Sequence, residues 1–191
     1  MADSNLTKKA LAKALKELME EVPFDKINVA QICEKCNMKR KSFYYHFKDK
    51  YDLVNWIFDT EIISIVAMEN LVMEQLSLSS RWEMIDNFCQ AFYKNRNFYR
   101  KALKIKGQNS FSDHFRKCIQ PLLKKRLTLL AGKTPLNEFT INFFSDACIC
   151  AIERWLLEKN CMTPEQFTAL LKNIIEIYAV SYKEMKETDT L

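Results

Sequence analysis

The segment Asn28–Leu53 reads NVAQICEKCNMKRKSFYYHFKDKYDL. It contains two short helical patterns, separated by the break Cys36-Asn37-Met38. Asparagine tolerates the left-handed backbone conformation better than most residues other than glycine, so Asn37 suits a tight turn. The second helical pattern is rich in cations and aromatic residues. These features predict a helix-turn-helix whose second helix is suited to the major groove of DNA.

The start of the second helix carries the side chains that the first turn of a recognition helix presents to base edges. Lysine and arginine pair with guanine or phosphate, and hydroxyl groups bond to phosphates or bases. Phe43 and Phe47 lie four residues apart and are expected to point inward, holding the helix against its domain. The candidate DNA contacts are Lys39, Arg40, Lys41, Ser42, Tyr44, Tyr45 and His46, together with Lys50 as a phosphate contact at the start of the next helix.

Helical periodicity extends over nearly the whole chain and predicts an all-α protein of about nine helices. Only 2 Gly and 4 Pro occur in 191 residues, which argues against a loop-rich or all-β fold. Asn28 is expected to cap the first motif helix, with Gln31 as its reciprocal partner, and Asp49 to cap the helix that follows the motif. The last two patterns cover about 137–159 and 163–186.

Positive charge is concentrated at the N-terminal end. The net charge is +5; residues 1–50 hold 11 Lys/Arg against 7 Asp/Glu, and residues 51–191 hold 18 against 17. A basic module joined to a nearly neutral body indicates contact with a polyanion. The alternative, a solvated cationic surface, is left open by charge alone.

Seven Cys occur in a chain whose N-terminus resembles no signal peptide and which has no apolar run of about 18 residues. We expect a cytoplasmic protein with reduced thiols and no membrane partner. Cys33 and Cys36 lack a second ligand pair at zinc-finger spacing, so small core residues explain them better than a metal does. With only His46 and His114 present, no Ser-His or Cys-His catalytic set is supported. We therefore expect no enzyme activity, cofactor or metal.

The motif region resembles the DNA-binding domain of TetR/AcrR-type transcriptional regulators over about residues 6–58. The resemblance runs from Thr7, in the first helix, through the segment FDKINV at 24–29, to SFYYHFKDK at 42–50. Two positions depart from the family pattern. Asn37 stands where the turn usually has glycine, and Lys41 stands where a glycine is frequent early in the recognition helix.

This resemblance implies a three-helix DNA-binding domain in residues 1–50 and a helical regulatory domain in 51–191. It also implies a homodimer that forms through the last two helices and binds a palindromic double-stranded DNA operator. The interpretation we favour is that this dimer is a repressor. Residues 97–103 and 107–111 resemble a subgroup typified by the dihydroxyacetone-kinase operon regulator. The resemblance to that subgroup leaves a second interpretation open, in which the protein is an activator that works through a protein partner. A third interpretation is a protein-interaction module.

The effector, a small molecule or a protein, is not identified by the sequence. Family members often have a small-molecule pocket in the C-terminal domain, and aromatic residues at helical spacing are candidates to line one. The same spacing is also typical of ordinary hydrophobic core. The search area for an effector pocket comprises Phe88, Phe92, Tyr99, Phe111, Phe115 and Trp155.

Overall fold

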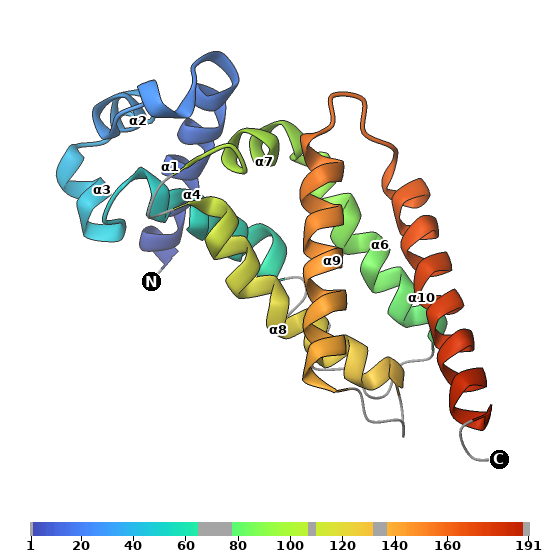
Figure 1. Ribbon diagram of the computed structural model, residues 1–191. Helices are drawn as coiled ribbons and strands as arrows, with labels where there is room; N and C mark the ends of the chain where they lie inside the picture. The colour runs from blue at the N-terminus through green and yellow to red at the C-terminus, as the bar shows by residue number, and fades with distance from the viewer. Residues whose placement is uncertain (1, 65–77, 107–109, 132–136, 189–191) are drawn as a thin grey trace. The chain divides into compact units, whose positions relative to one another are not determined.

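The computed structural model describes residues 2–64, 78–106, 110–131 and 137–188. Those ranges contain nine α-helices and no strand, as the periodicity predicted (Figure 1). The chain divides into two compact units, Met1–Ile65 with Asn95–Cys118, and Val66–Lys94 with Ile119–Leu191. The predicted domain boundary near residue 50 falls inside the first unit and stays a prediction.

The first unit is built on the long helix α1, against which the motif helices pack. Leu11 and Leu15 on α1 are completely buried, as expected for the apolar stripe of an amphipathic helix. Helices α2, α3, α4 and α7 all contact α1. The elements are α1 (Ala2–Glu21), the 3₁₀ turn η1 (Phe24–Lys26), α2 (Val29–Lys35), α3 (Arg40–His46), α4 (Lys50–Phe58), the π-helical turn η2 (Asp59–Ile63), α7 (Arg96–Ala102) and the start of α8 (Phe111–Ala131).

Two side-chain caps fix where the motif helices begin, and both were predicted. The side chain of Asn28 accepts a hydrogen bond from the Gln31 backbone N–H at 3.0 Å, and the Gln31 side chain accepts one from the Asn28 N–H at 2.9 Å. This reciprocal pair is a capping box. Asp49 accepts from the N–H groups of Tyr51 and Asp52 at 2.9 and 2.8 Å, and so caps α4.

The turn of the motif adopts the predicted left-handed conformation. Asn37 has φ of 53°, and among the described residues it is the one non-glycine position with positive φ. The Met38 N–H donates to the Cys33 carbonyl oxygen at 2.8 Å, which closes the C-terminal end of α2. The turn then leads directly into α3, so the conformation of Asn37 sets the angle between the two motif helices.

Replacing Asn37 with Ala is expected to reduce the free energy of unfolding by about 1 kcal/mol, because a Cβ without a polar side chain disfavours the left-handed region. Asn37→Gly, the matched variant, is expected to be neutral or slightly stabilising, because glycine adopts positive φ freely. Urea unfolding of the three proteins measures the difference. An Asn37→Ala protein as stable as Asn37→Gly would contradict this account of the turn.

An aromatic cluster around Phe58 joins α4, α7 and α8 inside the first unit. The Phe58 ring lies 5.3 Å from that of Phe111, 5.7 Å from Phe115 and 6.4 Å from Tyr99, measured between centroids. All four side chains are nearly or completely buried. Edge-on contacts of this kind add to the hydrophobic contribution of each ring. The cluster attaches the helix that follows the motif to the rest of the unit.

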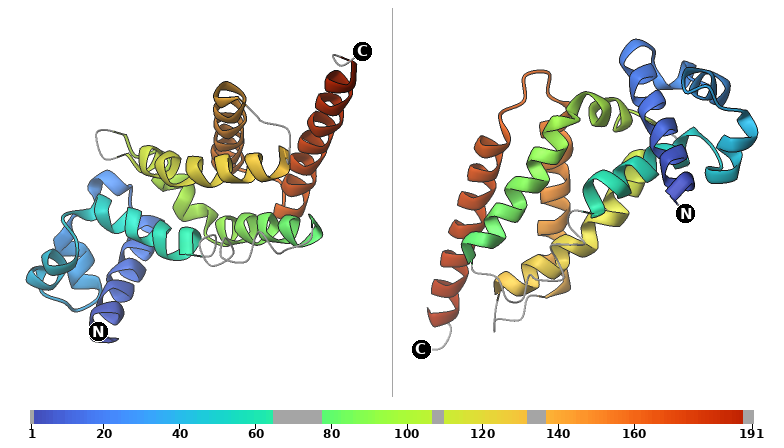
Figure 2. Two further views of the ribbon diagram at one scale, coloured as in Figure 1. Left: turned by 90° about the horizontal axis from the view of Figure 1, so that it is seen from below. Right: turned by 180° about the vertical axis from the view of Figure 1, so that it is seen from behind.

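The second unit contains α6 (Leu78–Lys94), α9 (Glu138–Leu157) and α10 (Pro164–Thr188). Helices α6 and α10 pack side by side (Figure 2). The buried Trp155 ring stacks on Phe167 with centroids 4.5 Å apart, and its Nε1–H donates to the Met162 carbonyl oxygen at 2.8 Å. This pairing holds the α9–α10 connection. No helix in the described ranges is long and apolar enough to cross a bilayer.

Candidate nucleic-acid interface

Helix α3 has one buried and one exposed face. Phe43 is fully buried and Phe47 is 3% exposed, so both point inward as predicted. Phe47 also packs against Trp56 of α4, with ring centroids 5.7 Å apart. By contrast, Tyr44 is 58% and Tyr45 is 83% exposed. The exposed face of this seven-residue helix therefore carries two large aromatic side chains.

The cations predicted as DNA contacts lie at the N-terminal end of this helix. Lys39 is the N-cap residue and makes no side-chain cap, and Arg40 and Lys41 occupy the first two helical positions. All three are exposed. Helix α3 lies at the margin of the first unit (Figure 1). The unbonded backbone N–H groups of a helix start add partial positive charge at the same place.

Ser42 and His46 are half-buried on the flanks of the exposed face. The His46 ring stands edge-on to that of Tyr45, with centroids 4.9 Å apart, and contacts the buried Phe47 at 6.3 Å on its other side. His46 therefore restricts where the Tyr45 ring can go. The seven predicted positions thus lie on α3 and at its N-cap, five of them exposed and two half-buried, and their contact with DNA remains a prediction.

Lys50 has a structural role that sequence reasoning missed. Its ammonium donates hydrogen bonds to the carbonyl oxygens of Phe24 at 2.8 Å and Ile27 at 2.7 Å, and lies 4.4 Å from the centroid of the Phe24 ring. Burial lowers the pKa of the Lys50 ammonium below its usual range. The side chain thus fastens η1 to the start of α4. The predicted phosphate contact stays a prediction, and the ammonium already has these protein acceptors.

A second polar cluster missed by sequence reasoning joins α1, η2 and α7. The Lys16 ammonium donates to the Glu61 carboxylate at 2.5 and 2.7 Å, and the Tyr99 hydroxyl donates to the same carboxylate at 3.4 Å. Burial and the negative charge of Glu61 raise the pKa of Tyr99 well above its usual value. The Lys16 ammonium also donates to the Asn95 side-chain oxygen at 3.3 Å, and the bonded pairs of this cluster are separated by 38 to 79 positions in the chain. No local sequence pattern connects them.

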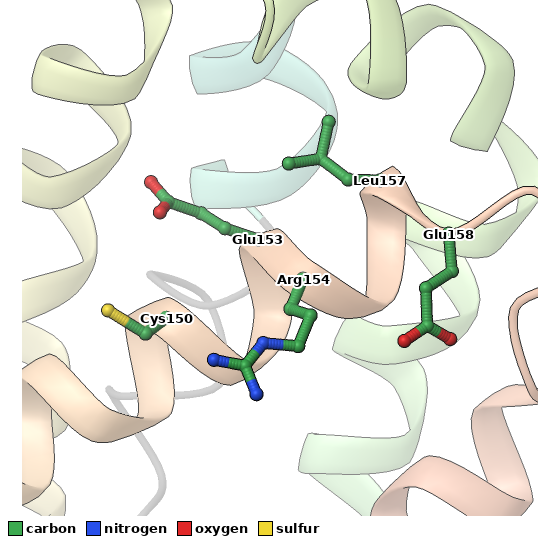
Figure 3. A pocket seen from close by; sticks show the side chains of 5 residues that line it. All are labelled: Cys150, Glu153, Arg154, Leu157 and Glu158. Carbon is green, nitrogen blue, oxygen red and sulfur yellow. The ribbon is translucent and has the colours of Figure 1, made fainter.

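Five of the six residues suggested for an effector pocket are buried in the cores of the two units, and the sixth, Phe88, is half-buried. Tyr99, Phe111 and Phe115 belong to the cluster around Phe58 in the first unit, whereas the other three belong to the second. A hollow beside α9 is lined by different residues, none of the six predicted (Figure 3). The effector pocket remains a prediction. The hollow is lined by Cys150, Glu153, Arg154, Leu157 and Glu158.

Comparison with known proteins agrees with this architecture at both ends of the chain. Residues 11–57 match the family described as bacterial regulatory proteins, tetR family, and residues 80–177 match the transcriptional regulator C-terminal region. The HTH-type dhaKLM operon transcriptional activator DhaS of Lactococcus lactis subsp. lactis (strain IL1403) is 32% identical over 66 residues. That match covers 35% of this chain and 35% of the relative, so the chain spans about a third of the relative's length.

Solved structures of similar fold cover nearly the whole chain. The dihydroxyacetone kinase operon activator DhaS superimposes with a TM-score of 0.67 at 20% identity, covering 91% of this chain and 96% of that one. A TetR-family regulator from Syntrophomonas wolfei str. Goettingen gives 0.76 at 12% identity, with 92% and 96% coverage. NalD, the secondary repressor of the MexAB-OprM efflux pump in Pseudomonas aeruginosa, gives 0.69 at 18%, with 91% and 95%. The helix-turn-helix, the all-helical fold and the two family matches agree: this chain belongs to the TetR family of bacterial transcriptional regulators.

Proposed function

We propose that this protein is a non-enzymatic, cytoplasmic transcriptional regulator that reads double-stranded operator DNA with α3. The observation that carries the proposal is the division of α3 into two faces. Phe43 and Phe47 are buried on one side, while Tyr44 and Tyr45 are exposed on the other, next to a cationic helix start. A helix held firmly from behind can present its N-terminal side chains to base edges in a fixed geometry.

The exposed side chains suit two kinds of DNA contact. Lys39, Arg40 and Lys41 neutralise phosphates or bond to the O6 and N7 acceptors of guanine in the major groove. The Tyr44 and Tyr45 hydroxyls bond to phosphates or bases, and their rings pack on thymine methyl groups. Phosphate contacts set the position of the protein on the duplex, and base contacts select the sequence. Both kinds are available on this one helix.

The C-terminal helices support a homodimer. Leu170, Ile174 and Ile177 are 51, 57 and 67% exposed along one side of α10. Phe139 and Phe143 of α9 are also exposed, and their rings stack on each other with centroids 6.4 Å apart. Apolar residues at this spacing need a partner surface, and the same pair of helices from a second copy would bury them in a four-helix bundle. Two recognition helices would then read a palindrome whose half-sites are about 34 Å apart.

The salt dependence of binding tests the proposal. The probe is a duplex that the full-length protein selects from a random-sequence pool, and its affinity is measured by fluorescence anisotropy from low to physiological salt. Because each neutralised phosphate releases counterions, a dimer making roughly 6–10 phosphate contacts should lose about 10³- to 10⁵-fold in affinity between about 50 and 200 mM salt. A nearly flat dependence, or failure to select any duplex, would contradict DNA reading by α3.

Repression is the direction of regulation that we propose, with activation as a second candidate. The likeness to DhaS favours the second candidate, because that protein is described as an operon activator, whereas NalD is described as a repressor. An effector, whether a small molecule or a protein partner, would act through its different affinities for two conformers of the dimer. Repression and activation are distinguished by a fusion of the target promoter to a reporter gene, whose expression is measured with and without the gene for this protein. Deletion raises expression for a repressor and lowers it for an activator.

A further inference from the structure

Three side chains with metal-binding atoms converge inside the first unit. The His114 Nε2 lies 2.8 Å from Asp59 Oδ1, and the Cys118 Sγ lies 3.6 Å from that nitrogen and 3.9 Å from that oxygen. One ligand atom from each of the three residues lies within 4.8 Å of the other two. We propose that Asp59, His114 and Cys118 form a binding site for a divalent transition-metal ion, with Zn²⁺ the best match to this donor set.

The distances are close to those of a tetrahedral zinc site. Zinc bonds of about 2.0–2.3 Å to nitrogen, oxygen and sulfur place the nitrogen and oxygen ligands about 3.4 Å apart, and place sulfur about 3.6 Å from each of them. The distances from the Cys118 sulfur to the His114 nitrogen and the Asp59 oxygen already agree with this geometry within about 0.3 Å. Only the His114–Asp59 pair has to separate, by about 0.6 Å, as the ion replaces their hydrogen bond.

The local backbone explains why the three side chains meet. His114 and Cys118 are four residues apart on α8 and therefore project from the same helix face. Asp59 is the first residue of η2, the π-helical turn that follows α4. Turns of this kind widen a helix locally and occur frequently at functional sites. The Phe58 ring stands edge-on to the His114 imidazole, with ring centroids 5.8 Å apart, and packs against it.

The surroundings allow an ion to enter and leave a place for solvent as the fourth ligand. The side chains of Asp59 and His114 are 46% and 23% exposed, and Cys118 is half-buried. Burial and the nearby Asp59 raise the pKa of the Cys118 thiol. Binding requires the thiol to lose its proton, which passes to solvent as the thiolate–metal bond forms. Three protein ligands with one open position is an arrangement zinc commonly accepts.

The sequence contained only part of this signal. The His-x-x-x-Cys spacing of His114 and Cys118 indicates a shared helix face, but two residues are too few to specify a site. The third ligand lies 55 positions earlier in the chain. In the sequence His114 is an isolated histidine, and the expectation of no metal rested on the lack of a second ligand pair for Cys33 and Cys36.

Titration of the reduced, full-length protein with Co²⁺ tests the site. Tetrahedral cobalt bound to a thiolate gives intense d–d bands and a sulfur-to-metal charge-transfer band in the near ultraviolet, so the thiolate ligand is detected directly. We expect saturation at one equivalent per chain and displacement by Zn²⁺. Cys118→Ser should remove the charge-transfer band, and His114→Ala should weaken binding at least about tenfold, as the loss even of outer partners does.

Two further variants control the measurement. Cys36→Ser changes another half-buried thiol of the same unit, whose Sγ donates to the Ile32 carbonyl oxygen at 3.2 Å, and should leave the titration unchanged. Asp59→Asn keeps the size of the side chain while removing its charge, and should weaken binding at least about tenfold while the far-ultraviolet circular dichroism stays that of the wild type. The proposal would be overturned if the wild-type protein showed no charge-transfer band. It would also be overturned if the band persisted in Cys118→Ser or disappeared in Cys36→Ser. This readout does not involve DNA, so its failure is separate from failure of the proposed function.

Discussion

Replacing Lys39 and Tyr45 together with alanine is expected to weaken binding to the selected duplex at least about 100-fold, while the protein remains folded. Groove contacts of this type are each worth about 1–3 kcal/mol, and the dimer loses both contacts twice. Tyr45 is 83% exposed and Lys39 is an exposed N-cap residue without a side-chain cap, so neither contributes appreciably to the core. Fluorescence anisotropy at fixed salt gives the affinity, and a urea unfolding curve checks the fold.

Two further variants make the result specific to α3. Lys13→Ala removes the same charge from α1, where the side chain is 80% exposed and pairs with Glu17 at 3.9 Å, and is expected to change the affinity less than about threefold. Tyr45→Phe keeps the ring and removes only the hydroxyl, so its DNA affinity should lie between that of Lys13→Ala and that of the double variant. Equal losses from Lys13→Ala and from the double variant would mean that binding reports net charge and not the recognition helix.

The replacement Phe43→Ala is expected to lower the free energy of unfolding of the DNA-binding unit by about 3–5 kcal/mol, because it opens a cavity where a fully buried ring was. Its ring packs against those of Tyr44 and Phe47 at 5.5 and 5.7 Å between centroids. A loss of that size is a large part of the roughly 5–15 kcal/mol that stabilises a typical domain. Urea unfolding followed by circular dichroism measures it, and DNA binding is expected to disappear as the helix loses its support.

The neighbouring residue is the matched control. Tyr44→Ala removes an aromatic ring from the same helix, but this ring is 58% exposed, so the stability is expected to change by less than about 1 kcal/mol. DNA affinity should nevertheless fall, because Tyr44 belongs to the exposed patch. If Tyr44→Ala destabilised the protein as much as Phe43→Ala, the division of α3 into a supporting and a reading face would be wrong.

Features that depend on neighbouring residues were correctly predicted. The caps at Asn28 and Asp49 and the left-handed turn at Asn37 each involve side chains and backbone groups within five positions. The inward direction of Phe43 and Phe47 follows from helical spacing alone. A local bond of the same kind opens α10, where the Thr163 N–H donates to the Gln166 side chain at 2.9 Å.

Roles that depend on distant residues were missed or incompletely predicted. Lys50 was predicted from its position at a helix start to hold phosphate, but its acceptors are carbonyl oxygens 23 to 26 positions away. Charge and spacing do not distinguish an ammonium turned toward solvent from one turned into the fold. The same applies to the aromatic residues proposed to line a pocket, because periodicity predicts burial without specifying which residues share a core.

Local sequence was therefore sufficient for the all-helical fold class, the helix-turn-helix motif and the exposed face of α3. Hydrogen bonds within a helix or turn join residues a few positions apart, so their geometry is specified by the neighbouring side chains. The attachment of Lys50 to η1, the Lys16–Glu61–Tyr99 cluster and the meeting of Asp59 with His114 and Cys118 required the folded chain. Those contacts exist only because packing brings distant helices together, and packing depends on the shapes of whole surfaces, which no short stretch of sequence contains.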